Sequence, residues 1–192
     1  SIVDLSPAGH QPMISPGGRY VIAFNGEVYN HNILRDELGE KPWRGHSDTE
    51  TLLAGFDHWG IQGTVERAMG MFAFAVWDKS ENTLVLGRDR IGEKPLYYGW
   101  QGNSFLFGSE LKALKQHPAF KAEISKESVC LFLRYSNVPA PYSIYSGFRK
   151  LEPGCLLSLS LALPEPKIWK YWSAIDLIKK GINSPFPGTP LD

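Results

Sequence analysis

The sequence is low in cysteine, carries no excess of charge of either sign and contains no long hydrophobic run. Its 192 residues include two cysteines, and 20 lysines and arginines balance 20 aspartates and glutamates. A chain without net charge lacks the positive field that attracts nucleic acid or anionic membranes. No apolar run reaches the roughly 18 residues of a membrane helix. We therefore expect neither nucleic acid nor a membrane as a partner.

Motifs of several large enzyme classes are also missing. The sequence has no phosphate-binding P-loop, dinucleotide fingerprint, zinc-protease motif, Cys-x-x-Cys pair or nucleophile elbow. Its five histidines show no ligand spacing, so we predict no metal site. Cys130 and Cys155 stand in apolar contexts, which favours structural thiols over a disulfide or a reactive thiol. Low cysteine use favours a reducing, cytoplasmic location.

The residues that are present suit one globular domain. Hydrophobic residues make up 43% and aromatic residues 12% of the chain, enough for a sizeable core. Apolar and β-branched runs predict strands at residues 20–24, 71–77, 83–86, 95–100, 104–108, 155–161 and 167–172. Helical spacing predicts helices at residues 31–38, 48–59, 64–68, 111–116 and 174–180, and one after Ser125 with Val129, Phe132 and Leu133 on its inner face. We expect a layered α/β sandwich, a sheet covered on both faces by helices.

Polar residues indicate where several of these helices begin. Asn30, Ser109 and Ser125 are each expected to cap the helix that follows. Ser47, followed three residues later by Glu50, has the pattern of a capping box. Residues 1–19, rich in Ser, Pro and Gly, are predicted to form loops with a remnant of a strand.

The step Asn25-Gly26 follows the predicted strand at residues 20–24 and indicates a sharp turn. Such a turn would leave the carboxamide of Asn25, the main-chain N–H of Gly26 and the carboxylate of Glu27 at a strand end. Two neutral donors side by side are what an oxyanion hole needs. The alternative is a plain hairpin turn, for which Asn-Gly is the commonest signal.

Four segments together resemble the glutaminase domain of the asparagine synthetases, class II glutamine amidotransferases of the N-terminal-nucleophile hydrolase fold. They are Phe24 to Asn30, Ser47 to Glu50, Gly87 to Tyr98 and Gly108 to Lys112. The resemblance covers residues 1 to about 172 and implies an αββα sandwich, with residues 173–192 as a linker toward a synthetase domain. Within the third segment, Arg88-Asp89-Arg90 also reads as an ion-paired loop between strands, and we assign it no catalytic step.

The resemblance implies a chemistry for the Asn-Gly pair. In the family, an N-terminal cysteine attacks the side-chain amide of glutamine, and its own α-amino group serves as the base. By motif, the side chain of Asn25 and the backbone N–H of Gly26 would hold the oxyanion of the tetrahedral intermediate.

The resemblance also implies residues that bind glutamine. Glu27 and Asp48 would hold its α-ammonium group, and the backbone of Ile2 and Val3 would line its pocket. Taken alone, Asp48 is explained by the dipole of the helix that it begins, and Glu27 by a solvated turn.

The family's nucleophilic cysteine and its arginine for the α-carboxylate of glutamine stand ahead of the stretch Ser1-Ile2-Val3-Asp4. We therefore expect the fold to be truncated at its N-terminus, and the 192 residues to be an inactive portion of a longer protein. Ser1 is rejected as a substitute nucleophile, because the alignment puts it on an interior strand.

The synthetase half would carry a Ser-Gly-Gly-x-Asp-Ser loop, which is absent here, and would bind ATP and Mg²⁺; the glutaminase domain itself needs no cofactor. The expected reaction is the amidation of aspartate with ammonia from glutamine, and the parent protein could form a homodimer. Two alternatives stay open, namely another acceptor such as a sugar acid, and a non-catalytic relic domain kept as a scaffold.

Overall fold

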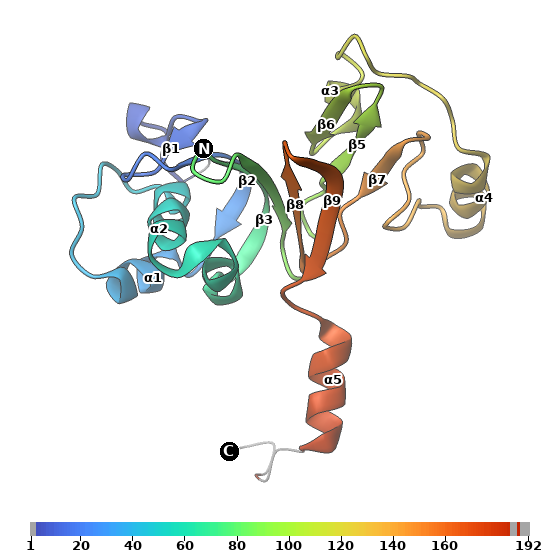
Figure 1. Ribbon diagram of the computed structural model, residues 1–192. Coiled ribbons are helices and arrows are strands. Elements are labelled where there is room, and N and C mark those ends of the chain that lie inside the picture. Colours follow the sequence, from blue (N-terminus) through green and yellow to red (C-terminus); the bar gives the residue numbers. More distant parts are fainter. Residues whose placement is uncertain (1–2, 185–187, 189–192) are drawn as a thin grey trace.

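The computed structural model describes residues 3–184 and residue 188, and it arranges them in four layers (Figure 1). A six-stranded antiparallel sheet has the order β1-β2-β3-β4-β8-β9, and a three-stranded antiparallel sheet has the order β6-β5-β7. The larger sheet is built from β1 (Met13–Ile14), β2 (Tyr20–Val28), β3 (Gly70–Asp78), β4 (Thr83–Arg88), β8 (Cys155–Ser160) and β9 (Leu163–Lys170). The smaller sheet is built from β5 (Tyr97–Gln101), β6 (Ser104–Gly108) and β7 (Phe148–Lys150).

Helices α1 (His31–Leu38) and α2 (Asp48–Arg67) lie on one face of the larger sheet, and the short α3 (Leu111–Leu114) follows β6. A first 3-10 turn covers Pro7–Gly9. Two further helices, α4 (Lys126–Tyr135) and α5 (Ala174–Asn183), carry exposed apolar side chains. The predicted layered α/β sandwich is confirmed, and the second sheet on the other face of the larger sheet agrees with the αββα type that the resemblance implies. The expectation of helices on both faces of one sheet was wrong.

The side-chain alternation of β3 explains the layers. Phe72 and Phe74 join the core under α1 and α2, whereas Ala73 and Ala75 face the second sheet and its Tyr98. Successive side chains of a strand point to opposite faces, so this strand is buried on both, as its sequence predicts. A third cluster, Leu106, Leu114 and Phe148, packs the second sheet against α3.

The predicted turn at Asn25-Gly26 is wrong, because β2 continues through both residues to Val28. Asn25 lies opposite Ala73 and Gly26 opposite Phe72 in the ladder with β3. Gly26 has a φ of 150°, and a Cβ at this position would collide with the main-chain oxygen of Met71. Glycine is therefore required here for the close approach of two backbones within a sheet, not for a turn.

Helix α1 has the predicted bounds, and Gly60 interrupts α2 as predicted. The backbone is non-helical there, with φ 75° and ψ 169°, so two helical parts meet at a kink. The second part runs to Arg67 and contains most of the short helix predicted at residues 64–68. Strands β1 and β7 were not predicted, since two or three residues give no usable periodicity.

Two of the four predicted caps are wrong, and a third is half right. The side chain of Asn30 does not cap α1; it binds the main chain of Arg67 and Met69, at 3.0 and 2.8 Å, and ties α1 to the end of α2. Ser109 does not cap α3, which begins after Glu110. Ser125 caps α4 as predicted.

At the start of α2, Ser47 accepts a hydrogen bond from Thr49 N–H and caps the helix as predicted. The second half of the predicted capping box is absent. Glu50 instead accepts hydrogen bonds from the main-chain N–H groups of Arg44 and Gly45. It therefore stabilises the loop before the helix.

The inner face predicted for α4 is wrong. Phe132 is 51% and Leu133 77% exposed, and Cys130 on the same helix is exposed, whereas Cys155 is buried as expected of a structural thiol. Helix α5 also exposes its apolar residues and points away from the layers (Figure 1).

No helix in the described part of the chain is long and apolar enough to cross a membrane. The linker predicted over residues 173–192 begins with α5, and residues 185–187 and 189–192 lie outside the described residues.

Candidate active site

The outer edge of β2 carries a row of main-chain N–H groups that point away from β3. Phe24 N–H donates to Oε1 of Gln11 at 2.6 Å, and Val28 N–H donates to Oδ2 of Asp48 at 2.9 Å. Because the N–H groups of alternate residues in a strand point to the same side, the N–H of Gly26 points to this edge too. The Gly26 N–H thus lies between the N–H groups of Phe24 and Val28, which both donate to side-chain oxygens.

The opposite strand supports this assignment. The main-chain oxygen of Phe72 accepts from Asp89 N–H at 2.8 Å, and its N–H donates to the Asp89 carboxylate, so both groups face away from β2. Gly26 and Phe72 therefore form a non-hydrogen-bonded pair. Since β1 pairs with β2 only as far as Ile22, no described strand covers the edge at Gly26.

Asn25 points to the face of β2 that looks toward the second sheet. Its Nδ2 donates to Oγ of Ser109 at 3.0 Å, and the two residues are 84 positions apart in sequence. The two side chains line a cavity of about 160 Å³ together with Gln11, Ala23, Phe24, Ala73, Phe74, Ala75, Leu96 and Phe107. A carboxamide and a backbone N–H for which the described residues supply no acceptor, one residue apart, thus lie on β2 beside a cavity.

Asp48 is buried at the first turn of α2. Its two carboxylate oxygens accept from Val28 N–H and from Thr49 N–H, both at 2.9 Å, so it fixes the start of the helix to β2. Glu27 precedes Val28 and is half-buried. Asp48 is therefore tied to the residue that follows Glu27 in β2. Its position in the first turn of α2 is also compatible with the helix-dipole interpretation.

His31, the first residue of α1, lies within the field of both carboxylates. Burial lowers the pKa of His31, whereas the charges of Asp48 and Glu27 raise it. Within the described part of the chain, Nδ1 of His31 and Oγ1 of Thr49 are buried without a hydrogen-bond partner. Buried polar atoms without partners are uncommon in proteins, and two of them here mark a site with unused hydrogen-bonding capacity.

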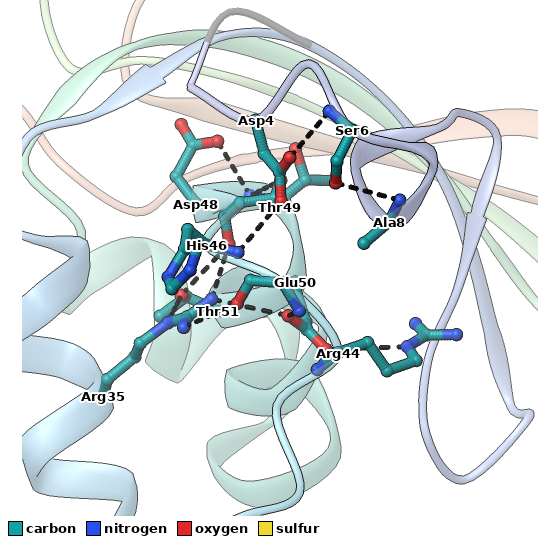
Figure 2. A network of polar contacts seen from close by, with 12 residues as sticks. Asp4, Ser6, Ala8, Arg35, Arg44, His46, Asp48, Thr49, Glu50 and Thr51 are labelled. Atoms are coloured by element: carbon teal, nitrogen blue, oxygen red, sulfur yellow. Dashed lines mark hydrogen bonds and ion pairs between the residues drawn. The ribbon is translucent and has the colours of Figure 1, made fainter.

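The segment that carries Val3 is held by Asp4 against the loop before α2 (Figure 2). The Asp4 carboxylate accepts from the N–H groups of His46 and Ser6, both at 2.9 Å. Hydrogen bonds from the side chain of Ser6, and then from His46 N–H, lower the pKa of Asp4 to about 2. Ile2 lies outside the described residues.

A buried ion pair supports the same loop from the other side (Figure 2). The Glu50 carboxylate lies 3.4 Å from Arg35 of α1 and 3.5 Å from Arg44. Arg35 also donates to Thr51 Oγ1 and to the main-chain oxygens of the loop. Removing one member of such a pair leaves a buried charge, so these residues stabilise the approach to Asp48.

The predicted ion pairing in the loop after β4 is wrong. The buried carboxylate of Asp89 accepts from four main-chain N–H groups, those of Phe72, Gly92, Glu93 and Lys94. Arg88 donates to three main-chain oxygens, and within the described residues neither side chain forms an ion pair. The charged side chains of Arg88 and Asp89 therefore stabilise this loop by hydrogen bonds to main-chain groups. The bond between Asp89 and Phe72 fixes the part of β3 that lies opposite Gly26.

Sequence reasoning missed Gln11, Ser109 and Asp4 as parts of the site. An Asp two residues before a Ser is a turn signal that could have indicated Asp4. Gln11 and Ser109 gave no such signal, because their partners lie 13 and 84 positions away.

The fold is that of the glutamine amidotransferases. Glutamine phosphoribosylpyrophosphate amidotransferase from Bacillus subtilis superimposes with a TM-score of 0.59 at 19% identity, over 88% of this chain and 33% of that chain. The allosteric regulatory enzyme of purine biosynthesis also gives 0.59, at 20% identity, over 85% and 31% of the two chains. These similarities show that the chain shares the fold of these two proteins.

The sequence then gives the family. Residues 1–172 match the glutamine amidotransferase domain, and the chain belongs to this family. It is 40% identical over 182 residues to a glutamine-hydrolysing asparagine synthetase of Bacillus subtilis (90% of this chain, 28% of the relative), and 34% identical over 192 residues to a putative one of Methanocaldococcus jannaschii (92% and 37%). Asparagine synthetase B of Escherichia coli is 40% identical over 116 residues (59% and 21%). The resemblance to asparagine synthetases is confirmed, and the chain spans well under half of the length of these relatives.

Proposed function

We propose that this domain hydrolyses glutamine to glutamate and ammonia, as the ammonia-donating half of an asparagine synthetase. One observation carries the proposal: Asn25 and Gly26 present two neutral donors on a stretch of β2 that no described strand covers, next to Glu27 and to Val28, which Asp48 holds. A scaffold domain needs none of these four groups.

The chemistry assigns a role to each group. The Asn25 carboxamide and Gly26 N–H stabilise the oxyanion that forms when the amide of glutamine is attacked. Glu27 and Asp48 bind the α-ammonium group, since a desolvated cation requires anionic partners. The assignment of the Ile2 and Val3 backbones to the glutamine pocket stays a prediction from the resemblance, and Ile2 lies outside the described residues.

Neither cysteine of the chain takes the role of nucleophile. Cys155 is buried between the two sheets, where burial raises the pKa of its thiol, and Cys130 lies on the exposed α4. The attacking group in this proposal is the N-terminal cysteine of the family. We therefore predict no glutamine turnover by the 192 residues as a separate polypeptide.

For the whole protein we propose transfer of the ammonia to aspartate, in a synthetase domain that binds ATP and Mg²⁺. The names of the similar proteins support aspartate, and no observation favours a sugar acid. The homodimer and the cytoplasmic location stay predictions.

The test uses the natural protein with aspartate, ATP, Mg²⁺ and glutamine labelled with ¹⁵N in its amide. We expect ¹⁵N in the side-chain amide of asparagine. The Asn25→Ala variant should lose glutamine-dependent synthesis and keep synthesis from added ammonia, because only the donor site is changed. Labelled product from another acceptor would overturn the choice of aspartate, and a natural protein that uses ammonia alone would overturn the donor role.

A further inference from the structure

Ser109 is the polar side chain that the second sheet brings to Asn25. It follows the last residue of β6 and is half-buried, and the hydrogen bond from Asn25 Nδ2 joins the two sheets at the candidate oxyanion site. It caps none of the described helices, and among the described residues its side chain accepts a hydrogen bond from Asn25.

A carboxamide does not hold its own orientation. The terminal torsion of Asn is broad and roughly two-fold, so the group can turn to present either its NH₂ or its oxygen. An oxygen directed at a developing oxyanion would repel it, whereas the NH₂ would stabilise it. Something other than the Asn25 torsion must select between the two orientations.

The contact with Ser109 restrains the carboxamide in the orientation that the structure shows. One N–H of Asn25 donates to Ser109 Oγ at 3.0 Å, so the amide oxygen points away from Ser109. A hydroxyl can also donate, so Ser109 restrains this torsion and does not alone exclude the flipped amide. Among the described residues, no acceptor is recorded for the second N–H of the same nitrogen. Ser109 in turn is placed by β6, whose Gly108 pairs with Tyr97 of the central strand of the second sheet.

We propose that Ser109 is a positioning residue that holds the Asn25 carboxamide with its NH₂ toward the oxyanion of the reaction. This inference rests on the proposed function. It adds a residue from a different layer of the sandwich, and it makes the second sheet a determinant of the rate of glutamine hydrolysis.

The kinetic test compares Ser109→Ala and Ser109→Thr in the natural protein. Loss of orientation should lower kcat for glutamine about 10- to 100-fold, the scale of a misplaced catalytic group, with KM changed less than about twofold. Ser109→Thr keeps the hydroxyl and should restore most of kcat. Ser104→Ala, at the other end of β6, is the matched control and should match the wild type.

A double variant separates positioning from a general structural effect. If Ser109 acts through Asn25, adding Ser109→Ala to Asn25→Ala should cause no further loss, because effects of residues that act as a unit are not additive. An additive loss, or a Ser109→Ala protein with normal kcat, would overturn the proposal.

A second readout does not depend on activity. In natural protein labelled with ¹⁵N-asparagine, the side-chain signal of Asn25 is assigned by its loss in Asn25→Ala. Ser109→Ala should speed the hydrogen exchange of these amide protons, and Ser109→Thr should not. An unchanged exchange rate of the Asn25 amide protons in Ser109→Ala would refute the contact. Faster exchange in Ser109→Ala, together with no glutamine hydrolysis by the natural protein, would refute the proposed function and leave the contact established.

Discussion

Asp48 has a structural role and a proposed binding role at the scale of a single side chain. Its oxygens accept hydrogen bonds from the main chain of Val28 and Thr49, and the proposed function adds a charge that binds the α-ammonium group of glutamine. Both main-chain groups keep an acceptor when the carboxylate becomes an amide, so its neutralisation should affect binding more than the fold.

We predict that Asp48→Asn in the natural protein raises KM for glutamine about 10- to 100-fold, the equivalent of a hydrogen bond to a charged group. The amide oxygen can still accept from Val28, and Thr49 N–H still has Ser47 Oγ, so the protein should remain folded. Steady-state kinetics measures the effect, with the exposed Asp36→Asn on α1 as control. Equal KM values for the two variants would contradict the assigned role.

Asp4 gives a prediction for pH. The folded-state pKa of about 2 lies below the ordinary value of 3.8, so the unfolded chain takes up the proton first as the pH falls. The stabilisation is therefore complete above about pH 4 and is lost between about pH 4 and pH 2. Melting temperatures of the 192-residue chain and of Asp4→Asn should differ at pH 6 and converge toward pH 2.5. Parallel curves across this range would show that Asp4 does not contribute in this way.

The motifs predict Asn25, Gly26, Glu27 and Asp48 as site residues, because residue type limits the chemistry that each can perform, and this assignment stays a prediction. Their local geometry could not be predicted. The turn expected at Asn25-Gly26 was wrong because the glycine serves a close approach to Met71, a contact that only the pairing of β2 with β3 reveals. The contact of Ser109 with Asn25 could not be predicted either, because it joins residues that only the folded chain brings together.

At the scale of elements, periodicity predicted the positions of most strands and helices. It did not predict which elements pack against each other. The apolar alternation of β3 identified a strand buried on both faces. The same kind of pattern in α4 predicted an inner face that is exposed in the structure. A pattern shows that a face is apolar, but it does not say what covers it.

This difference predicts unequal effects of two leucine truncations. Leu53→Ala in α2 should lower the free energy of unfolding by about 2–5 kcal/mol, because its side chain is fully buried. Leu133→Ala in α4 should change it by less than about 0.5 kcal/mol. Urea unfolding of the 192-residue chain measures both. A large loss from Leu133→Ala would show that α4 packs inward after all.

At the scale of the whole molecule, the sandwich brings residues of both sheets and of α2 to the candidate site. β2 supplies Asn25 and Gly26, α2 supplies Asp48, and the second sheet supplies Ser109. The layered class was predictable from the order of elements, whereas the sheet order β1-β2-β3-β4-β8-β9 was not, since pairing of β4 with β8 joins segments about 70 residues apart. Function at this site therefore depends on long-range pairing.

The most direct test of the account is the rate at which the natural protein releases glutamate from glutamine, compared with its Asn25→Ala variant. We predict measurable hydrolysis by the natural protein and a decrease in kcat of about 100- to 1000-fold in the variant, the usual effect of losing one oxyanion donor. Equal rates for the two proteins, or no glutamate from either, would contradict the assignment of this strand edge as the site of glutamine hydrolysis.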